Sequence, residues 1–349
     1  MSAAAPRLAW VDYSKGLCIV LVVLMHATLG AEKAAGSVSW LHGFIDWARP
    51  FRMPDFFLIS GLFLARQIDR PWREFLDKKL IHFGYFYLLW MSIQVLVRSY
   101  GLAQAQGLSG VAQAWLLGLV EPFGTLWFIY MLAVFFIAAK LARPLPQALI
   151  LGVGAALQMA QIETGWLVID EFAARFVYFY SGFALAPLIF TFAGRVAAAS
   201  PARVGAALAI WAIANGAIVA AGVSQWPGIG LALGYVGAAA VIAVGVLLVN
   251  TRLAEPLRYC GRNSIIIYLA FFLFMAGTRF LLLLQFNDNV SLVALLSTLS
   301  GVAGPLLLAG VAQRLGMTFL FQRPAWARLR PASAKQDAFE TRLAHMSKN

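Results

Sequence analysis

A lysine and a histidine stand at the two ends of one unbroken apolar run near the start of the chain. Lys15 precedes the apolar residues 17–25, and His26 follows them, 11 residues after the lysine. With about 100° of rotation per residue, this spacing puts both side chains on one face of a helix, roughly 16 Å apart along its axis. Ionisable groups at membrane depth usually face a bundle interior and carry function. The pair could therefore line a cavity, or it could be a snorkelling lysine and a helix-end histidine at opposite headgroup layers.

Charged side chains also flank a proline in the second apolar stretch. Arg52 and Asp55 lie three residues apart, on either side of Met53 and Pro54. They could form an ion pair on one helix face, or a polar rim that receives a hydrophilic substrate from outside. Pro54 is typical of the first turn of a helix.

The loop after this stretch carries a dense basic cluster. Such residues commonly set membrane topology and contact anionic lipids. Arginine and lysine also bind phosphates well, so a phosphate-rich ligand would suit this loop. The cluster consists of Arg66, Arg70, Arg73, Lys78 and Lys79.

The composition indicates that membrane helices must position these residues. Hydrophobic residues make up 61% of the 349-residue chain and charged residues only 12%, which no soluble domain of this size shows. The net charge of +12 recurs in short loops between apolar runs, which indicates topology rather than nucleic-acid binding. Cys18 and Cys260 are too isolated for a disulfide framework or a metal site. No cofactor motif is visible.

The apolar runs predict an all-α polytopic membrane bundle with about ten spans. A further stretch, 111–120, is too short to span and is expected as an interfacial helix. We expect a transmembrane domain over residues 1–321 and a polar, basic tail over 322–349, with a short helix near 337–345. The predicted spans are 14–31, 44–65, 80–98, 124–141, 146–162, 172–191, 203–223, 228–249, 263–285 and 292–313.

The loop charges alternate along this series. All but six of the 27 lysines and arginines fall on the side of the N-terminus, so the positive-inside rule puts both termini in the cytoplasm. Miscounting any one span would scramble this alternation. The six basic residues on the outer side are Lys33, Arg49, Arg52, Arg98, Arg175 and Arg279.

Five segments, in this order, resemble the acyltransferase family 3 membrane proteins, especially the fucose-4-O-acetylase-like branch. They read WVDYSKGLCIVLVVLMHA, RMPDFFLISGLFL, FLDKKLIHFGYFYLLW, GTLWFI and GRNSIIIYL. The strongest element is the family's pattern of a basic residue and a histidine separated by ten residues, carried here by Lys15 and His26. There are departures: relatives often have a histidine where Arg52 stands, and a proline where this chain has Gly84 and Tyr85.

The resemblance implies an O-acyltransferase of the bacterial inner membrane. An acyl group, usually acetyl, would pass from cytoplasmic acyl-CoA, the co-substrate, to a sugar hydroxyl of a cell-envelope glycan, exopolysaccharide or lipid-linked saccharide. His26 would be catalytic with Lys15 as its basic partner, and the basic cluster would meet acyl-CoA. No metal and no bound cofactor are expected. The candidates for substrate contact are Arg52, Asp55, Trp127, Asp12 and Asn263.

Purely structural roles would also explain several of these residues. Trp127 could belong to an aromatic belt, while Asn263 and Ser264 are plausible helix N-caps. A transporter or flippase of a sugar or lipid compound, without chemistry, is the main alternative, since ten helices with buried charges would also suit it. A non-catalytic membrane scaffold is a third. The acceptor and the oligomeric state do not follow from the sequence.

Overall fold

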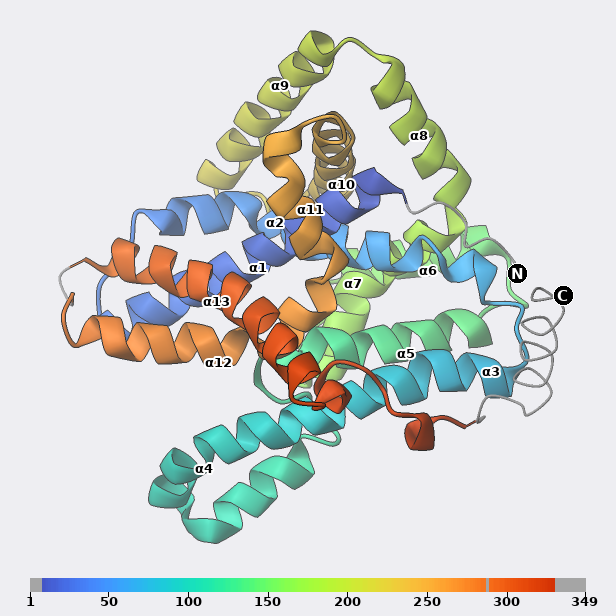
Figure 1. Ribbon diagram of the computed structural model, residues 1–349. Helices are drawn as coiled ribbons and strands as arrows, with labels where there is room; N and C mark the ends of the chain where they lie inside the picture. The colour runs from blue at the N-terminus through green and yellow to red at the C-terminus, as the bar shows by residue number, and fades with distance from the viewer. Residues whose placement is uncertain (1–7, 287–288, 330–349) are drawn as a thin grey trace, which may run out of the picture.

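Every regular element in the described residues of the computed structural model, 8–286 and 289–329, is helical (Figure 1). The tail helix expected near 337–345 lies outside the described residues. The longer elements are α1 (Ala9–Ala35), α2 (Leu41–Gly61), α3 (Trp72–Leu76), α4 (His82–Leu117), α5 (Trp127–Leu141), α6 (Gln147–Met159), α7 (Leu167–Ala184), α8 (Ala186–Ala198), α9 (Pro201–Ala220), α10 (Ile229–Leu248), α11 (Glu255–Arg262), α12 (Ser264–Leu283) and α13 (Val290–Arg314). Short turns of helix join them: η1 (Leu64–Arg66), η2 (Asp77–Ile81), η3 (Gly124–Leu126), η4 (Arg252–Ala254), η5 (Thr318–Leu320) and η6 (Ala325–Ala327).

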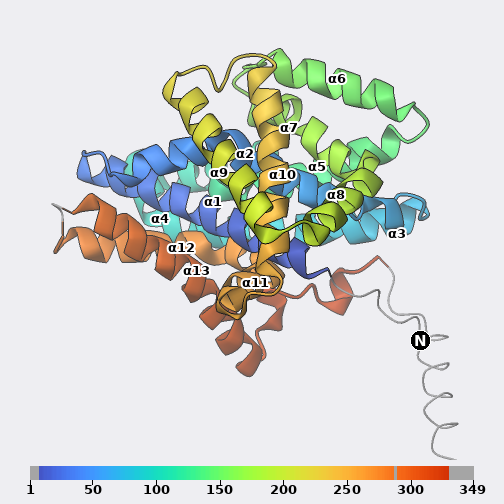
Figure 2. The same ribbon diagram turned by 90° about the horizontal axis from the view of Figure 1, so that it is seen from above.

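Helix α1 lies at the centre of the molecule. It contacts α2, α10, α11, α12 and α13, in keeping with the unbroken apolar run 17–25 at its middle, which can be buried on every side. The α12–α13 hairpin packs along one flank of α1, and α10 crosses it steeply, nearly end-on in Figure 1 and lengthwise in Figure 2. Lys15 and His26 are thus carried on a helix that five other helices contact.

Helices α2 and α7 cross through a reciprocal pair of glycines. A Cβ on Gly61 would come within 2.0 Å of the Phe179 carbonyl oxygen, and a Cβ on Gly182 within 1.9 Å of the Leu58 carbonyl oxygen. Small residues at such crossings let two backbones approach closely, which is how membrane helices gain packing contacts without a hydrophobic driving force. This crossing fixes α2 against the bundle.

The prediction of an all-α, multi-span membrane protein is confirmed. Seven helices of the described residues are long and apolar enough to cross a membrane, and an eighth span results if α7 and α8 count as one. The predicted span 44–65 corresponds to α2, which carries four charged residues, and 146–162 to α6, whose 13 residues rise only about 20 Å. The prediction of one helix over 172–191 is wrong, because α7 and α8 meet at a 74° bend.

The sequence predicts a helix too short to span over 111–120, and residues 108–117 form such a helix. It is the second arm of α4, which folds back after a kink at Gly107. Gly107 has φ 72° and ψ −178°, a conformation that glycine adopts without a steric penalty. The arm returns to the first arm, where the Trp115 indole donates to Ser92 Oγ at 3.0 Å and the Tyr87 hydroxyl donates to the Gly118 carbonyl.

Contacts between loops separate into two ends of the bundle. At one end Ser39 Oγ lies 2.8 Å from Ser291 Oγ. At the other end Arg143 pairs with Asp69 at 2.5 Å, and Arg323 pairs with Asp77 at 2.7 Å. These groupings agree with the alternating sides assigned from the loop charges, which predict that the Ser39 end faces outwards. The segment after residue 321 begins in contact with the bundle through Arg323.

Candidate functional site

The His26 ring faces the interior of the bundle. It is half-buried and packs against the Phe271 ring of α12, with the two ring centroids 5.4 Å apart. The Arg52 guanidinium of α2 lies within electrostatic reach of it. The imidazole therefore lies between α1, α2 and α12 and not on the outer surface of the bundle.

Helices α1 and α2 run antiparallel, and their register aligns a column of polar side chains. Arg52 lies near His26, and one turn further along α2 the Asp55 carboxyl oxygen Oδ2 accepts a hydrogen bond from Cys18 Sγ at 3.4 Å. Ser60 then lies on the same cavity wall as Lys15. Since Cys18 follows Lys15 by three residues, it falls between Lys15 and His26 on nearly the same face of α1. The column therefore extends from one end of the pair to the other.

Arg52 and Asp55 do not form the ion pair that their spacing allows. Arg52 Nη1 donates to the Ile45 carbonyl oxygen at 3.3 Å. Arg52 Nε and Asp55 Oδ1 are buried and have no hydrogen-bond partner within the described residues. Pro54 lies in the interior of α2, as Pro50 does, so the first-turn assignment is wrong. Buried polar atoms left unpaired are costly, which makes this stretch a candidate functional site.

Lys15 lines a cavity of about 250 Å³ at its own end of the column, which the loop charges predict to be the cytoplasmic end. Lys79 enters the same cavity from η2, with its Nζ 4.0 Å above the centre of the Phe136 ring. Ser60 and Ser264 add hydroxyl groups, and the walls are aromatic and aliphatic. His26 does not border this space. Two cations over apolar walls could hold an anionic or strongly polar end of a ligand.

The rest of the basic cluster lies outside this cavity. The Arg66 guanidinium stacks on Phe63, 5.5 Å from the ring centre. Arg70 bonds Glu74 at 3.2 Å, Arg73 donates to the Leu329 carbonyl at 3.2 Å, and Lys78 is exposed. Only Lys79 of the five predicted residues therefore reaches the cavity, while the others form the surface around its cytoplasmic side.

The remaining candidates separate into two places. Asp12 is buried beside Arg262, 3.8 Å away, and Asn263 begins α12 next to Ser264, so both lie at the Lys15 end and not near His26. Asn263 does not cap α12 through its side chain, which instead donates to the Tyr259 carbonyl at 2.9 Å. The Trp127 ring is half-buried within the bundle, with its centroid 6.0 Å from that of Phe57.

The sequence interpretation missed a lysine that holds the basic loop in place. Lys140 of α5 is 6% exposed and donates to the carbonyl oxygens of Ile68 at 2.5 Å and Arg70 at 2.6 Å. Its ammonium also lies 4.9 Å from the centre of the Phe75 ring. A lysine at the end of an apolar run resembles any snorkelling residue, so only its burial reveals this role.

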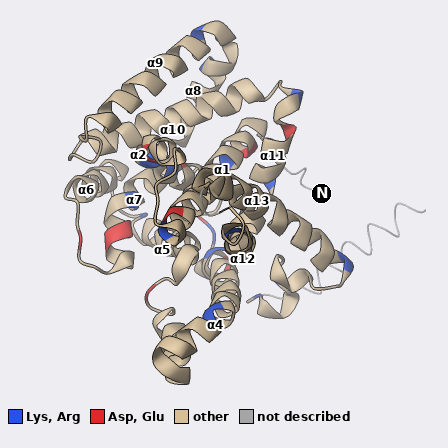
Figure 3. Ribbon diagram, turned by 90° about the vertical axis from the view of Figure 1, so that its left-hand side faces the viewer, with Lys and Arg blue, Asp and Glu red and all other residues tan. Residues whose placement is uncertain are grey.

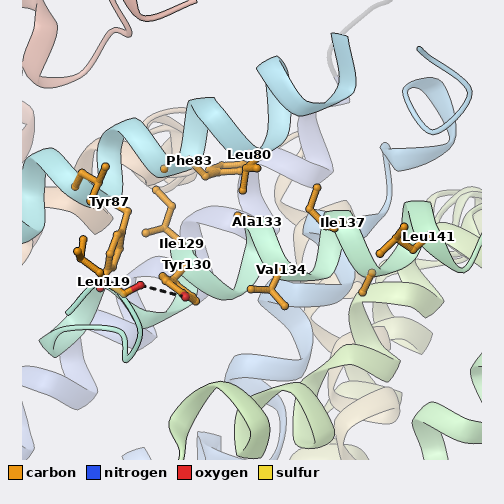
Figure 4. A pocket seen from close by; sticks show the side chains of 13 residues that line it. Leu80, Phe83, Tyr87, Leu119, Ile129, Tyr130, Ala133, Val134, Ile137 and Leu141 are labelled. Atoms are coloured by element: carbon orange, nitrogen blue, oxygen red, sulfur yellow. Dashed lines mark hydrogen bonds between the residues drawn. The ribbon is translucent and has the colours of Figure 1, made fainter. Parts of the chain in front are cut away.

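A second, larger hollow lies between α4 and α5 (Figure 4). Its volume is about 600 Å³, and its lining is apolar apart from Tyr87 and Tyr130. Phe83 and Ile129 border both this groove and the Lys15 cavity. These two side chains therefore form a partition between the polar cavity and an apolar groove.

The cysteines take no part in a cross-link. Cys18 and Cys260 are both free and buried. Burial raises the pKa of the Cys260 thiol, so that it stays protonated and unreactive near neutral pH.

The fold and the column together define a class: a multi-span helical membrane protein with a column of polar side chains that ends at an imidazole inside the bundle. Comparison with known proteins narrows the class. A family model described as an acyltransferase domain matches residues 8–310. The chain belongs to this family, acyltransferase family 3, which confirms the resemblance seen in the sequence, and it is a membrane acyltransferase in that broad sense.

One curated relative also matches. The inner membrane protein YcfT of Escherichia coli (strain K12) is 30% identical over 156 residues, which cover 38% of this chain and 43% of the relative. The chain thus matches less than half the length of that relative. No solved structure matches the chain.

Proposed function

We propose that the chain transfers an acyl group, most simply acetyl, from cytoplasmic acyl-CoA to a sugar hydroxyl of a cell-envelope glycan or lipid-linked saccharide. The observation that carries this proposal is the polar column between α1 and α2, which begins at the Lys15 cavity and ends at His26. The family gives the reaction class, and the similarity to the inner membrane protein YcfT supports a location in a bacterial inner membrane.

The donor would enter from the basic cytoplasmic surface. The nucleotide end of acyl-CoA carries several negative charges, and Arg66, Arg73 and Lys78 present cations around the entrance. The cavity of about 250 Å³ is too small for a nucleotide, so only the thin thioester arm would enter it. Lys15 and Lys79 would there meet the polar groups of this arm.

His26 would act as the general base. A sugar hydroxyl is a weak nucleophile unless a base removes its proton during the attack, and neutral imidazole suits this task near neutral pH. As the hydroxyl oxygen bonds to the thioester carbonyl carbon, its proton passes to the ring. When the C–S bond breaks, the CoA thiolate leaves and takes up that proton. Arg52, whose Nε has no partner, is a candidate donor to the oxyanion that forms in between.

The first prediction concerns His26 and Lys15. In liposomes that contain the purified full chain and acetyl-CoA, with a glycan acceptor outside, His26→Ala should lower acetyl transfer by about 10²- to 10⁴-fold, and Lys15→Ala should also abolish it. Mass spectrometry of the glycan measures the product. The matched control is Leu29→Ala, an exposed position on the same helix, which should keep full activity.

Two results would count against the proposal. Normal acetylation of envelope glycans in a His26→Ala strain would remove His26 from the mechanism. Movement of the glycan across the bilayer without an acetylated product would favour the transporter.

A further inference from the structure

Two arginines that the proposed reaction does not use come together on the outer side of His26. Arg98 belongs to α4 and Arg279 to α12, and their guanidinium groups lie within electrostatic reach of each other. Both are half-buried. In Figure 3, which looks onto this end of the bundle, basic positions are visible within α4 and α12. Both residues depart from the positive-inside bias, so topology does not explain them.

Arg279 reaches back towards the level of His26. Its Nη1 lies so close to α1 that a Cβ on Gly30 would come within 2.0 Å of it. Gly30 follows His26 by one helical turn and lies about 40° from it around the axis, so it shares nearly the same face. Helical side chains point towards the N-terminus of their helix, which brings the Arg279 guanidinium towards Phe271, the residue that contacts the imidazole.

Arg98 is held in place by aromatic rings. Its guanidinium carbon lies 4.3 Å from the centre of the Phe272 ring and 5.2 Å from that of Phe123. Stacking through the face of a guanidinium leaves its N–H edges available for hydrogen bonds. Phe272 follows Phe271 in the chain, so both arginines are tied to the part of α12 that borders His26.

A buried amide oxygen lies beside Arg98. Gln94, one turn earlier on α4, is fully buried; its Nε2 donates to Thr125 Oγ1 at 3.3 Å, and its Oε1 has no hydrogen-bond partner in the described part of the chain. A Cβ on the exposed Gly124 would lie 3.1 Å from this oxygen and 3.6 Å from Arg98 Nη2. An unpaired acceptor and a cation therefore lie side by side next to the exposed Gly124.

In the part of the chain that the structure describes, neither arginine forms an ion pair with a carboxylate. Glu32 is bonded to His42 at 2.8 Å, and Glu171 to Arg175 at 3.1 Å. Among the described residues, no carboxylate lies within ion-pair distance of Arg98 or Arg279. Two half-buried cations of like charge are unfavourable unless an anion joins them. A carboxylate or phosphate matches the fork of a guanidinium better than any neutral group.

We propose that Arg98 and Arg279 bind an anionic group of the saccharide acceptor, with the Gln94 amide accepting a hydrogen bond from a neighbouring hydroxyl. This inference rests on the proposed function and specifies its acceptor class: a saccharide that carries a carboxylate, as in a uronic acid, or a phosphate, as in a lipid-linked sugar. The anion would hold the sugar so that another of its hydroxyls meets His26.

Binding tests this inference without any need for turnover. Purified full-length protein in lipid nanodiscs is titrated with three probes: a uronic-acid tetrasaccharide, its carboxyl-reduced neutral counterpart, and the neutral sugar bearing a 1-pyrophosphate. We expect at least one anionic probe to bind about tenfold or more tightly than the neutral one. The preferred anionic probe identifies the source of the charge.

Variants of the two arginines test whether these residues cause the preference for anionic saccharides. Arg98→Gln and Arg279→Gln should each remove most of the anionic advantage, and Arg279→Lys should retain part of it. Lys33→Gln removes a basic charge from the same outer side at an exposed position and should leave the preference intact. Equal binding of neutral and anionic saccharides by the unmodified protein, or no binding of either anionic probe, would overturn the inference.

Failure of the proposed acyl transfer and failure of the inferred anion site give different results. Repeating the titration with His26→Ala should leave the anionic preference unchanged, because the base takes no part in binding the charge. If anionic saccharides bind preferentially but receive no acetyl group, the proposed acyl transfer fails and this inference stands. If neutral and anionic acceptors are acetylated equally well, the proposed acyl transfer stands and the inferred anion site fails.

Discussion

Single residues along α1 and α2 carry the functional argument. The spacing of Lys15 and His26 was enough to predict that they share one face, because that relation lies within one helix. The Cys18–Asp55 hydrogen bond could not be predicted, since it depends on the antiparallel register of two helices. The arginines above His26 were visible in the sequence only as exceptions to the loop charges.

At this scale we predict that Asp55→Asn separates stability from activity. The amide keeps the shape of the carboxyl and can still accept from Cys18, so the free energy of unfolding should stay unchanged or rise by up to about 3 kcal/mol. Acyl transfer should fall if the carboxyl belongs to the working column. Thermal unfolding in detergent and the liposome assay measure the two effects.

Asp46→Asn is the control for this comparison. Asp46 lies on the same helix and pairs with His42 at the surface, 3.5 Å away, so its loss should cost at most about 1 kcal/mol. Strong destabilisation by Asp55→Asn, with activity falling only in proportion, would show that the carboxyl serves the fold alone.

At the scale of whole helices, composition predicts where helices occur but not how they bend or cross. Apolar runs predicted the existence of the helices because burial and hydropathy agree over 15 to 25 residues. They did not predict the bend between α7 and α8 or the return of α4 after Gly107, because a bent helix and a straight one have the same hydropathy. The α2–α7 crossing likewise depends on glycines that look unremarkable in the sequence.

The crossing gives an element-scale prediction. Gly182→Ala puts a methyl group against the Leu58 carbonyl, so the two helices must separate, and the free energy of unfolding should fall by about 1–3 kcal/mol or more. Gly43→Ala, on α2, meets nothing within 4 Å and should be neutral or stabilising, because alanine favours helix. Thermal unfolding of both variants would show no difference if the crossing were looser than described.

The whole molecule has two sides, and this arrangement is open to direct measurement. Val38 and Leu253 are strongly exposed, at the outer and the cytoplasmic end respectively. In intact cells a membrane-impermeant maleimide should label Val38→Cys but not Leu253→Cys, which should react only after permeabilisation. Cys18 and Cys260 are buried and should give little background. Labelling of both positions from one side would contradict the span count.

The partition formed by Phe83 and Ile129 has a consequence for the length of the acyl group. The space on its polar side is small, about 250 Å³, while the apolar side offers about 600 Å³. A two-carbon group needs only the first, whereas a fatty tail would have to pass between these two side chains. Phe83→Ala should therefore admit octanoyl-CoA alongside acetyl-CoA, as a donor competition assay would measure, and unchanged donor selectivity would mean that another wall sets the limit. Use of octanoyl-CoA by this variant would assign the control of acyl length to one aromatic ring.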